Sequence, residues 1–245
     1  MIVQIRQRLL IPLLACCCFG VARAEIVPIS RFSVVRAKGN ADGKTYDRMS
    51  YSEALTSWHK TELGFAQGTG DDFATGSAAQ AVVLDIERQT LQQIALESES
   101  DGAQRGGAIQ GISEFVLDFE VRKTPANFVL SGDMESIAPN SAAIYLRDLS
   151  QQTSIYSLSS QDSTDPYATI WATGSLKPGR YELNTFANVN SAEVWGSMTT
   201  LNATVQFSQP AVAPLPAAAI PGIGMLAIVI LASLTRRPKE EKVVT

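Results

Sequence analysis

Every second residue between Phe115 and Val121 is apolar, and this alternation constrains the fold more than any other feature of the chain. The residues between the apolar ones include Asp118 and Glu120. Because successive side chains of a β-strand point to opposite faces, the period of two predicts a strand with one buried and one exposed face.

The same period recurs in the C-terminal half of the chain. Further strands are marked by Ile144 with Leu146, by Ile155, by Tyr181 with Leu183, and by the run from Leu201 to Phe207. Turn-forming residues separate them: Lys123-Thr124-Pro125, Gly132-Asp133, Asp165-Pro166 and Lys177-Pro178-Gly179. Short strands without helical segments between them predict an all-β fold, an antiparallel β-sandwich of jelly-roll-like form over residues 25–209. In the last of these turns we expect Gly179 to supply a positive φ.

Residues 25–78 are less regular. We expect residues 50–63 to form a short helix or an irregular segment, with Trp58 and Leu63 packing on the sandwich. Residues 68–72 and 98–107 are expected to be loops, since Gly, Ser and Asp dominate them.

Between those two loops the pattern leaves two interpretations open. Residues 81–86 and 91–96 fit a hairpin, whereas residues 87–97 also fit a helix.

The N-terminus has the order of an export signal. Arg6 and Arg8 precede an apolar run from Leu9 to Gly20, which is followed by the small-x-small site formed by Ala22 and Ala24. We therefore expect residues 1–24 to be a signal peptide that is cleaved before Glu25. The competing interpretation is a lipoprotein signal with its lipid on Cys16. All three cysteines lie within this segment, so a chain cleaved after Ala24 contains no disulfide.

The C-terminus contains an apolar segment of the length of a membrane span. Residues 217–234 are 18 residues without a charge, and Arg236, Arg237 and Lys239 follow as a basic tail. Basic residues stay on the cytoplasmic side, so the preceding domain is expected outside the inner membrane. A permanent single-pass anchor is one interpretation. The helix-weakening Pro221 and Gly222 favour a segment that is processed.

A proline-rich motif immediately precedes this segment and carries a family resemblance. Val212, Pro214, Leu215 and Pro216, followed by an apolar helix and a basic tail, resemble the PEP-CTERM class of sorting signals, in particular its Pro-Leu-Pro variants. The commoner motif has Glu in place of Leu215, and Ala213 interrupts its usual Val-Pro contact. The run from Thr173 to Leu183 is also similar to a turn that many such proteins carry before a core strand.

The resemblance implies a sorting signal over residues 210–245. It implies that an exosortase-type membrane protease cuts at the motif and releases the protein or transfers it to the cell surface. The expected location is therefore an inner-membrane precursor, whose mature domain is periplasmic, on the cell surface or extracellular.

Charge excludes one class of partner. Residues 25–235 contain 13 basic and 22 acidic residues, a formal charge of 13 − 22 = −9. Such a field repels phosphate backbones, so we expect no nucleic-acid partner.

The local motifs of catalysis are incomplete. The segment from Gly39 to Thr45 has three residues between its glycines where a phosphate loop needs four, which predicts a turn. His59 is the only histidine and no Gly-x-Ser-x-Gly elbow accompanies it, so we expect it to have a surface or packing role. We expect no catalytic residues, no metal site and no cofactor.

Two sets of residues could still bind a ligand. Glu97, Glu99 and Asp101 would share one face if they lie on a strand, although solvated charges are the simpler interpretation. Trp171 and Trp195 could form an aromatic platform for sugar rings, although core packing is the simpler interpretation for them.

Two functions of different classes remain. The first is a non-catalytic cell-surface or extracellular-matrix protein, with exopolysaccharide as a possible associate. The alternative is a carbohydrate-binding module or carbohydrate-active enzyme on the same sandwich. An exposed Trp171 beside clustered carboxylates in a cleft would favour the alternative.

Overall fold

The computed structural model describes residues 23–88, 90–137, 140–162, 165–191 and 197–209. These residues form β-strands almost throughout, with one 3₁₀ turn at Ser160–Asp162. The strands are β1 (Glu25–Ala41), β2 (Lys44–Ser52), β3 (Trp58–Gln67), β4 (Phe73–Glu87), β5 (Thr90–Arg105), β6 (Gly107–Arg122), β7 (Ala126–Ser136), β8 (Ser141–Asp148), β9 (Thr153–Ser159), β10 (Tyr167–Leu176), β11 (Gly179–Ser191) and β12 (Ser197–Ser208).

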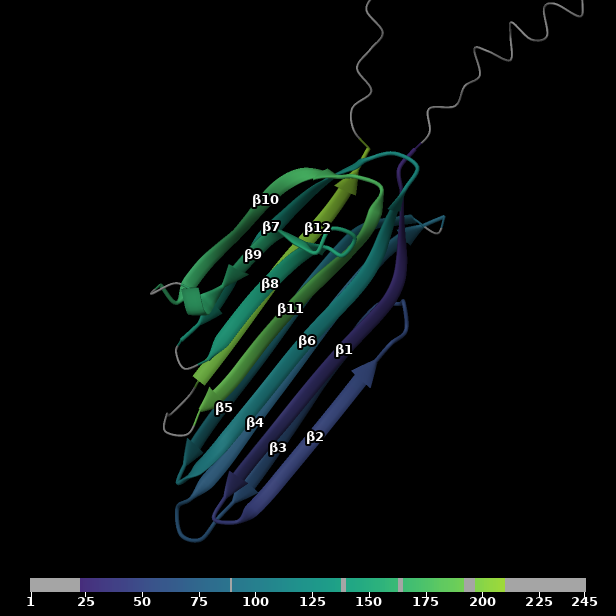
Figure 1. Ribbon diagram of the computed structural model, residues 1–245. Helices are drawn as coiled ribbons and strands as arrows, with labels where there is room; N and C mark the ends of the chain where they lie inside the picture. The colour runs from purple at the N-terminus through teal and green to yellow at the C-terminus, as the bar shows by residue number, and fades with distance from the viewer. Residues whose placement is uncertain (1–22, 89, 138–139, 163–164, 192–196, 210–245) are drawn as a thin grey trace, which may run out of the picture. The chain divides into compact units, whose positions relative to one another are not determined.

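The strands form two six-stranded antiparallel sheets that pack face to face (Figure 1). Sheet A has the order β2-β1-β6-β11-β8-β9, and sheet B has the order β10-β7-β12-β5-β4-β3. The antiparallel β-sandwich predicted from the alternating pattern is confirmed. Each predicted C-terminal strand is present, in β6, β8, β9, β11 and β12.

The N-terminal half differs from the sequence-based expectation. The segment 50–63 contains no helix and is irregular only at residues 53–57, which connect the end of β2 to the start of β3. Residues 98–105, expected to be a loop, continue β5 to Arg105, whereas the expected loop at 68–72 is present. The hairpin interpretation of residues 81–96 is the correct one, since β4 and β5 pair along their whole length.

One turn prediction is wrong, and one detail of another is wrong as well. Gly132 and Asp133 lie within β7, where Gly132 pairs with Ala203 of β12 and Asp133 with Asn202. Gly179 begins β11, and it is not among the residues with a positive φ. The tight turn with left-handed residues is instead at Asp42 and Gly43, whose φ angles are 46° and 75°, as expected of a hairpin turn between β1 and β2.

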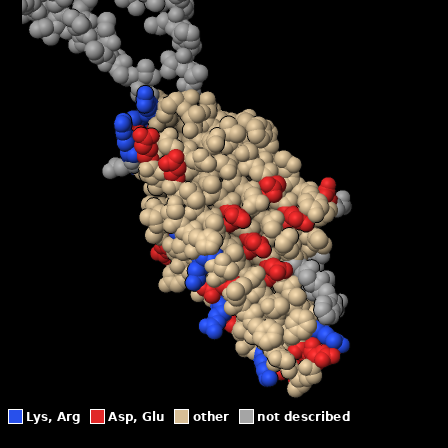
Figure 2. Space-filling view, turned by 180° about the vertical axis from the view of Figure 1, so that it is seen from behind, with Lys and Arg blue, Asp and Glu red and all other residues tan. Residues whose placement is uncertain are grey.

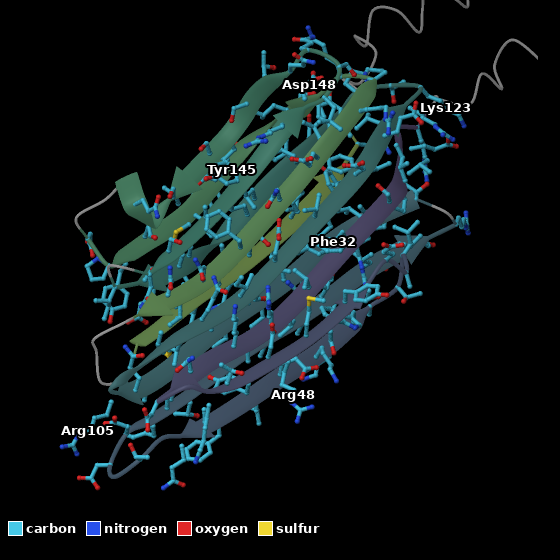
Figure 3. All side chains as sticks on the ribbon, turned by 60° about the horizontal axis from the view of Figure 1, so that its bottom comes forward. Phe32, Arg48, Arg105, Lys123, Tyr145 and Asp148 are labelled. Atoms are coloured by element: carbon cyan, nitrogen blue, oxygen red, sulfur yellow. The ribbon has the colours of Figure 1, made fainter. Side chains whose placement is uncertain are left out.

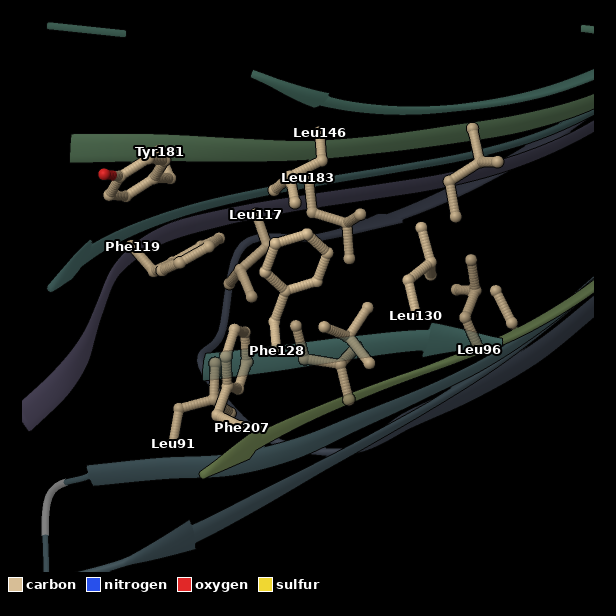
Figure 4. Close-up of a cluster of buried hydrophobic side chains, with 14 of the residues drawn as sticks. Leu91, Leu96, Leu117, Phe119, Phe128, Leu130, Leu146, Tyr181, Leu183 and Phe207 are labelled. Carbon is tan, nitrogen blue, oxygen red and sulfur yellow. The ribbon is translucent and has the colours of Figure 1, made fainter. Parts of the chain in front are cut away.

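The main core lies between the sheets toward the end where the described domain begins and ends. The inward residues of β6 and β11 meet those of β5, β7 and β12 there (Figure 4). Phe119 stacks on Tyr181 at a centroid distance of 5.6 Å and packs against Phe207 at 5.4 Å. The buried Tyr181 donates its hydroxyl hydrogen bond to the carbonyl oxygen of Lys177 at 2.7 Å, which satisfies its polar group.

Toward the opposite end the interior consists of small and polar residues. A second cluster of buried residues contains Ala41, Ala66, Ala74, Ile109 and Val189, with the ring of Tyr46 packed against it. A Cβ on Gly39 or Gly64 would overlap that ring and one on Gly76 would overlap its hydroxyl, so the three glycines form the space that Tyr46 occupies. The interior at this end is therefore filled by the Tyr46 ring and mostly small side chains, with Ile109 as the largest aliphatic residue of the cluster.

Several predictions lie outside the described residues. They are the signal segment up to Ala22, the membrane span 217–234, the motif residues Val212 to Pro216 and the basic tail. Within the part of the chain that the structure describes, no helix is long and apolar enough to cross a membrane.

Candidate functional site

The candidate site lies on the outer face of sheet B, which carries an exposed tryptophan and several exposed carboxylates. On β10, Ile170 is fully buried, and the period of two therefore turns Tyr167, Thr169, Trp171 and Thr173 to the outside. Trp171 is 64% exposed, although its size favoured a core position from the sequence. Along β10 the alternating pattern places Ile170 in the core. The same pattern therefore predicts that the neighbouring Trp171 points outward.

A shallow groove of about 350 Å³ begins one strand away from Trp171. Its floor lies across β7, β12, β5 and β4, and short side chains form it, including Ser131, Thr204 and Ala95. Ser131 is the direct cross-strand partner of Trp171, so the indole stands beside the end of the groove.

Polar side chains form the next row of the same groove. Asn202 of β12 lies between Glu97 of β5 and Asp133 of β7, and it pairs in register with both. The side-chain amide of Asn202 donates a hydrogen bond to Asp133 Oδ2 at 3.3 Å. Because the two carboxylates stand on strands that flank β12, their Cα atoms are separated by twice the inter-strand spacing, about 10 Å.

The parallel row toward the end of β10 has the same arrangement. Thr200 lies between Glu99 and Glu135, and Tyr167 is the cross-strand partner of Glu135. The Tyr167 hydroxyl donates a hydrogen bond to the Glu135 carboxylate, and this bond and the negative charge raise the pKa of Tyr167.

Gly132 lies below the groove, at a point where β7 and β12 leave no space for a side chain. A Cβ at this position would overlap the carbonyl oxygen of Asn202 and come within 2.9 Å of the Cα of Ala203. The absence of a side chain lets β7 approach β12 closely below the groove.

The predicted carboxylate face is confirmed. Glu97, Glu99 and Asp101 lie on β5 with their side chains exposed on the outer face of sheet B. Asp71 is at the far end of the domain beside Arg105, at 3.3 Å. Among the described residues, no group of three or more His, Cys, Asp or Glu side chains is arranged to hold a metal ion.

The remaining sequence candidates do not join this groove. His59 is exposed on the edge strand β3. Trp58 is half-buried with the Arg31 guanidinium 5.9 Å from its ring centroid, while Leu63 does not pack on the sandwich as expected, because it is 69% exposed. Trp195 lies outside the described residues.

The outer face of sheet A has a different character. Figure 3 labels Phe32 of β1 and Tyr145 of β8 on this face. Tyr145 stacks on Phe186 at 6.4 Å, with the Arg147 guanidinium 5.0 Å from the Tyr145 ring centroid. Tyr145 and Phe186 therefore cover each other, whereas Phe32 and Tyr51 on the same face are exposed, as Trp171 is on sheet B.

The fold and the groove define an antiparallel β-sandwich with one open, aromatic-flanked face. No protein-family model and no curated protein matches the sequence.

Among solved structures, the chain is similar to the enzymatically active domain of tailspike protein 4 of bacteriophage CBA120. The identity is 16%, over 60% of this chain and 19% of that chain, and the TM-score is 0.27. It is also similar to the structure of infectious bursal disease virus, Gx strain, with 10% identity over 80% of this chain and 59% of that one, and a TM-score of 0.26. The chain spans less than two thirds of either protein, and similarities of this size carry no functional argument.

Proposed function

We propose that the chain is an exported, non-catalytic surface or extracellular-matrix protein that holds polysaccharide on the outer face of sheet B. One observation carries the proposal: the exposed ring of Trp171 stands at the end of a groove whose next row contains Asp133, Asn202 and Glu97. Sugar rings present C–H groups that pack on an aromatic face, and their hydroxyl groups donate to carboxylate and amide oxygens. The groove offers both kinds of contact within two adjacent rows.

Two features support binding over glycoside hydrolysis. Paired catalytic carboxylates lie about 5 to 9.5 Å apart with open space between them. Here the Asn202 side chain stands between Glu97 and Asp133 and is hydrogen-bonded to the latter. Both carboxylates are also exposed, and a general acid requires an apolar enclosure. We therefore assign the face to binding.

Export and sorting belong to the same proposal. The signal peptide ending at Ala24 directs export, and the PEP-CTERM-like motif from Val212 to Pro216 is the substrate of an exosortase-type protease at the inner membrane. The jelly-roll-like class is proposed as well, supported by a chain that passes repeatedly between the two sheets, as at β5–β6, β6–β7 and β7–β8.

Affinity measurements with a panel of polysaccharides test the binding. We expect the full-length chain in non-ionic detergent to bind at least one glucan or amino-sugar polymer, and Trp171→Ala to weaken binding about 10- to 100-fold. Leu63→Ala is the matched control, because Leu63 is similarly exposed on the opposite edge of the same sheet. Unchanged affinity of Trp171→Ala, or no binding to any polymer in the panel, would contradict the proposal.

A further inference from the structure

The outer face of sheet B has an uncompensated negative charge. Figure 2 shows acidic side chains gathered on the middle of this face without basic side chains among them. None of these carboxylates forms an ion pair with a lysine or arginine of the described residues. They come from β4, β5 and β7: Asp85, Glu97, Glu99, Asp101, Asp133 and Glu135.

The outer face of sheet A, by contrast, carries ion pairs. Arg36 binds Asp47 at 2.5 Å, and Arg147 lies 3.8 Å from Glu182. Glu114 and Asp118 on that face form no such pair, but the carboxylates named on sheet B include no ion-paired residue at all. The two faces therefore differ in where their basic residues lie. The overall negative charge of the domain does not account for this difference.

Carboxylates without an ion pair stand on both sides of β12, and Glu97 and Asp133 among them line the groove. Glu97 and Glu99 lie along β5 on one side of β12, and Asp133 and Glu135 lie along β7 on the other. Successive outward residues on one strand are about 7 Å apart, and the two pairs are separated by about 10 Å. An extended polymer lying in the groove, across β7, β12 and β5, would therefore pass Asp133 and Glu97 in the nearer row, with Glu135 and Glu99 one row further along the same strands.

We propose that the groove selects glycans that carry protonated amino groups, of the kind present in incompletely acetylated glucosamine polymers. This inference rests on the proposed polysaccharide binding and adds the class of ligand. The argument is charge complementarity: the carboxylates attract ammonium groups and repel the uronate, sulfate or phosphate groups of acidic polysaccharides. Trp171 stacks on the sugar ring, and the carboxylates fix the ammonium groups beside it.

Each carboxylate on its own should contribute only a small part of the affinity for an amino sugar. An exposed ion pair changes an affinity by no more than about fivefold, so a single substitution is a weak test. Several pairs along one polymer add together, because each further contact is intramolecular. The two carboxylates that line the groove on either side of β12 should therefore be neutralised together.

The test compares two forms of one polymer. The full-length chain in non-ionic detergent is titrated with β-1,4-linked glucosamine oligomers and with their fully N-acetylated counterparts of the same length. The titration is made at mildly acidic pH, where the amines are protonated and the carboxylates ionised. We expect the amino form to bind at least about tenfold more tightly at low salt. The preference should shrink as salt is added, because exposed charges are screened.

The double variant Glu97→Gln/Asp133→Asn locates the effect. It should lose about tenfold in affinity for the amino form and distinctly less for the acetylated form, because the amide oxygens of Gln and Asn still accept hydrogen bonds from sugar hydroxyl groups. The matched control, Glu114→Gln/Asp118→Asn, removes the same charge from the outer face of sheet A and should change neither. If both oligomers bind equally, or if the control variant loses as much as the groove variant, the charge inference is wrong while polysaccharide binding stands. If neither binds and other polysaccharides also fail, the proposed function itself is wrong.

Discussion

The main chain of Ala24 is hydrogen-bonded at both its polar atoms to the side-chain amide of Gln209. The Ala24 amide donates to Gln209 Oε1 at 2.7 Å, and Gln209 Nε2 donates to the Ala24 carbonyl at 2.9 Å. Ala24 is itself buried in the main core. The two ends of the described domain are thus joined across 185 residues of sequence.

The position of signal cleavage should affect the free energy of unfolding, because the mature chain keeps these two hydrogen bonds only if it retains Ala24. Cleavage before Glu25, as the sequence predicts, removes Ala24 and both hydrogen bonds. We expect a chain that starts at Glu25 to be less stable by about 1 to 3 kcal/mol than one that starts at Arg23, from two hydrogen bonds of about 1 kcal/mol each and one buried methyl group. Urea unfolding measures the difference.

Gln209→Ala is the internal control for this prediction. It should destabilise the chain that starts at Arg23 and have little effect on the one that starts at Glu25, since the partner is then absent. Equal losses in both chains would show that Gln209 acts through other contacts.

A second prediction concerns Tyr46, whose buried hydroxyl has no hydrogen-bond partner among the described residues. Burial raises its pKa from 10.0 to about 12. A group whose pKa is raised on folding contributes stability below its unfolded pKa and loses it as the pH rises through the folded value. Stability should therefore fall between about pH 10 and 12.

Tyr46→Phe removes both the ionisation and the unpaired hydroxyl. We expect this variant to be as stable as the original or more stable by about 1 kcal/mol at neutral pH, and to lose less stability in alkaline solution. Urea titrations at neutral and alkaline pH decide it. A Tyr46→Phe variant that is markedly less stable at neutral pH would mean that the hydroxyl has a partner.

A third prediction concerns Gly64, where an added Cβ would overlap the ring carbons of Tyr46. Gly64→Ala should destabilise the protein by about 1 to 3 kcal/mol through overpacking. The same substitution in a Tyr46→Ala background should cost much less, because the two residues are in contact. Additive losses in the double variant would contradict the proposed contact.

The sequence predicts the C-terminal half of the fold well because its strands separate large apolar from polar residues. β6 alternates Phe115, Leu117 and Phe119 with acidic or less buried residues, and the pattern is read directly. In β5 the inward residues include Ser98 and Ser100, so the period of two is present in burial but not in hydrophobicity. The small, polar interior at this end is the physical reason that residues 98–105 resemble a loop in sequence.

The groove could not be predicted in the same way. Its residues come from four strands, and their juxtaposition depends on register: Glu97 meets Asn202, which meets Asp133. The sequence predicts a shared face for Glu97, Glu99 and Asp101 only if they lie on a strand, and β5 meets that condition. For Trp171 the sequence leaves core packing and an aromatic platform open, and in the structure its neighbour Ile170 occupies the core position.

A fourth prediction tests sorting. Changing Pro214 and Pro216 together to Ala should trap the full-length protein in the inner membrane of a host with a matching exosortase, because an extended backbone is what a protease cleft can bind. Pro210→Ala is the control outside the motif. Mass spectrometry of surface material should lack peptides from Arg236 onward in the unsubstituted protein. Recovery of peptides covering Lys239 to Thr245 would favour a permanent anchor.

The central claim is that Trp171 contacts the polysaccharide, and its fluorescence reports this directly. In the variant Trp58→Phe/Trp195→Phe, Trp171 is the sole tryptophan. Titration of this full-length variant with a polysaccharide that it binds should shift the indole emission to shorter wavelength and protect it from acrylamide quenching, since the exposed ring becomes covered by sugar. Emission and quenching that stay unchanged while the polysaccharide is bound would place the binding site elsewhere and contradict the account.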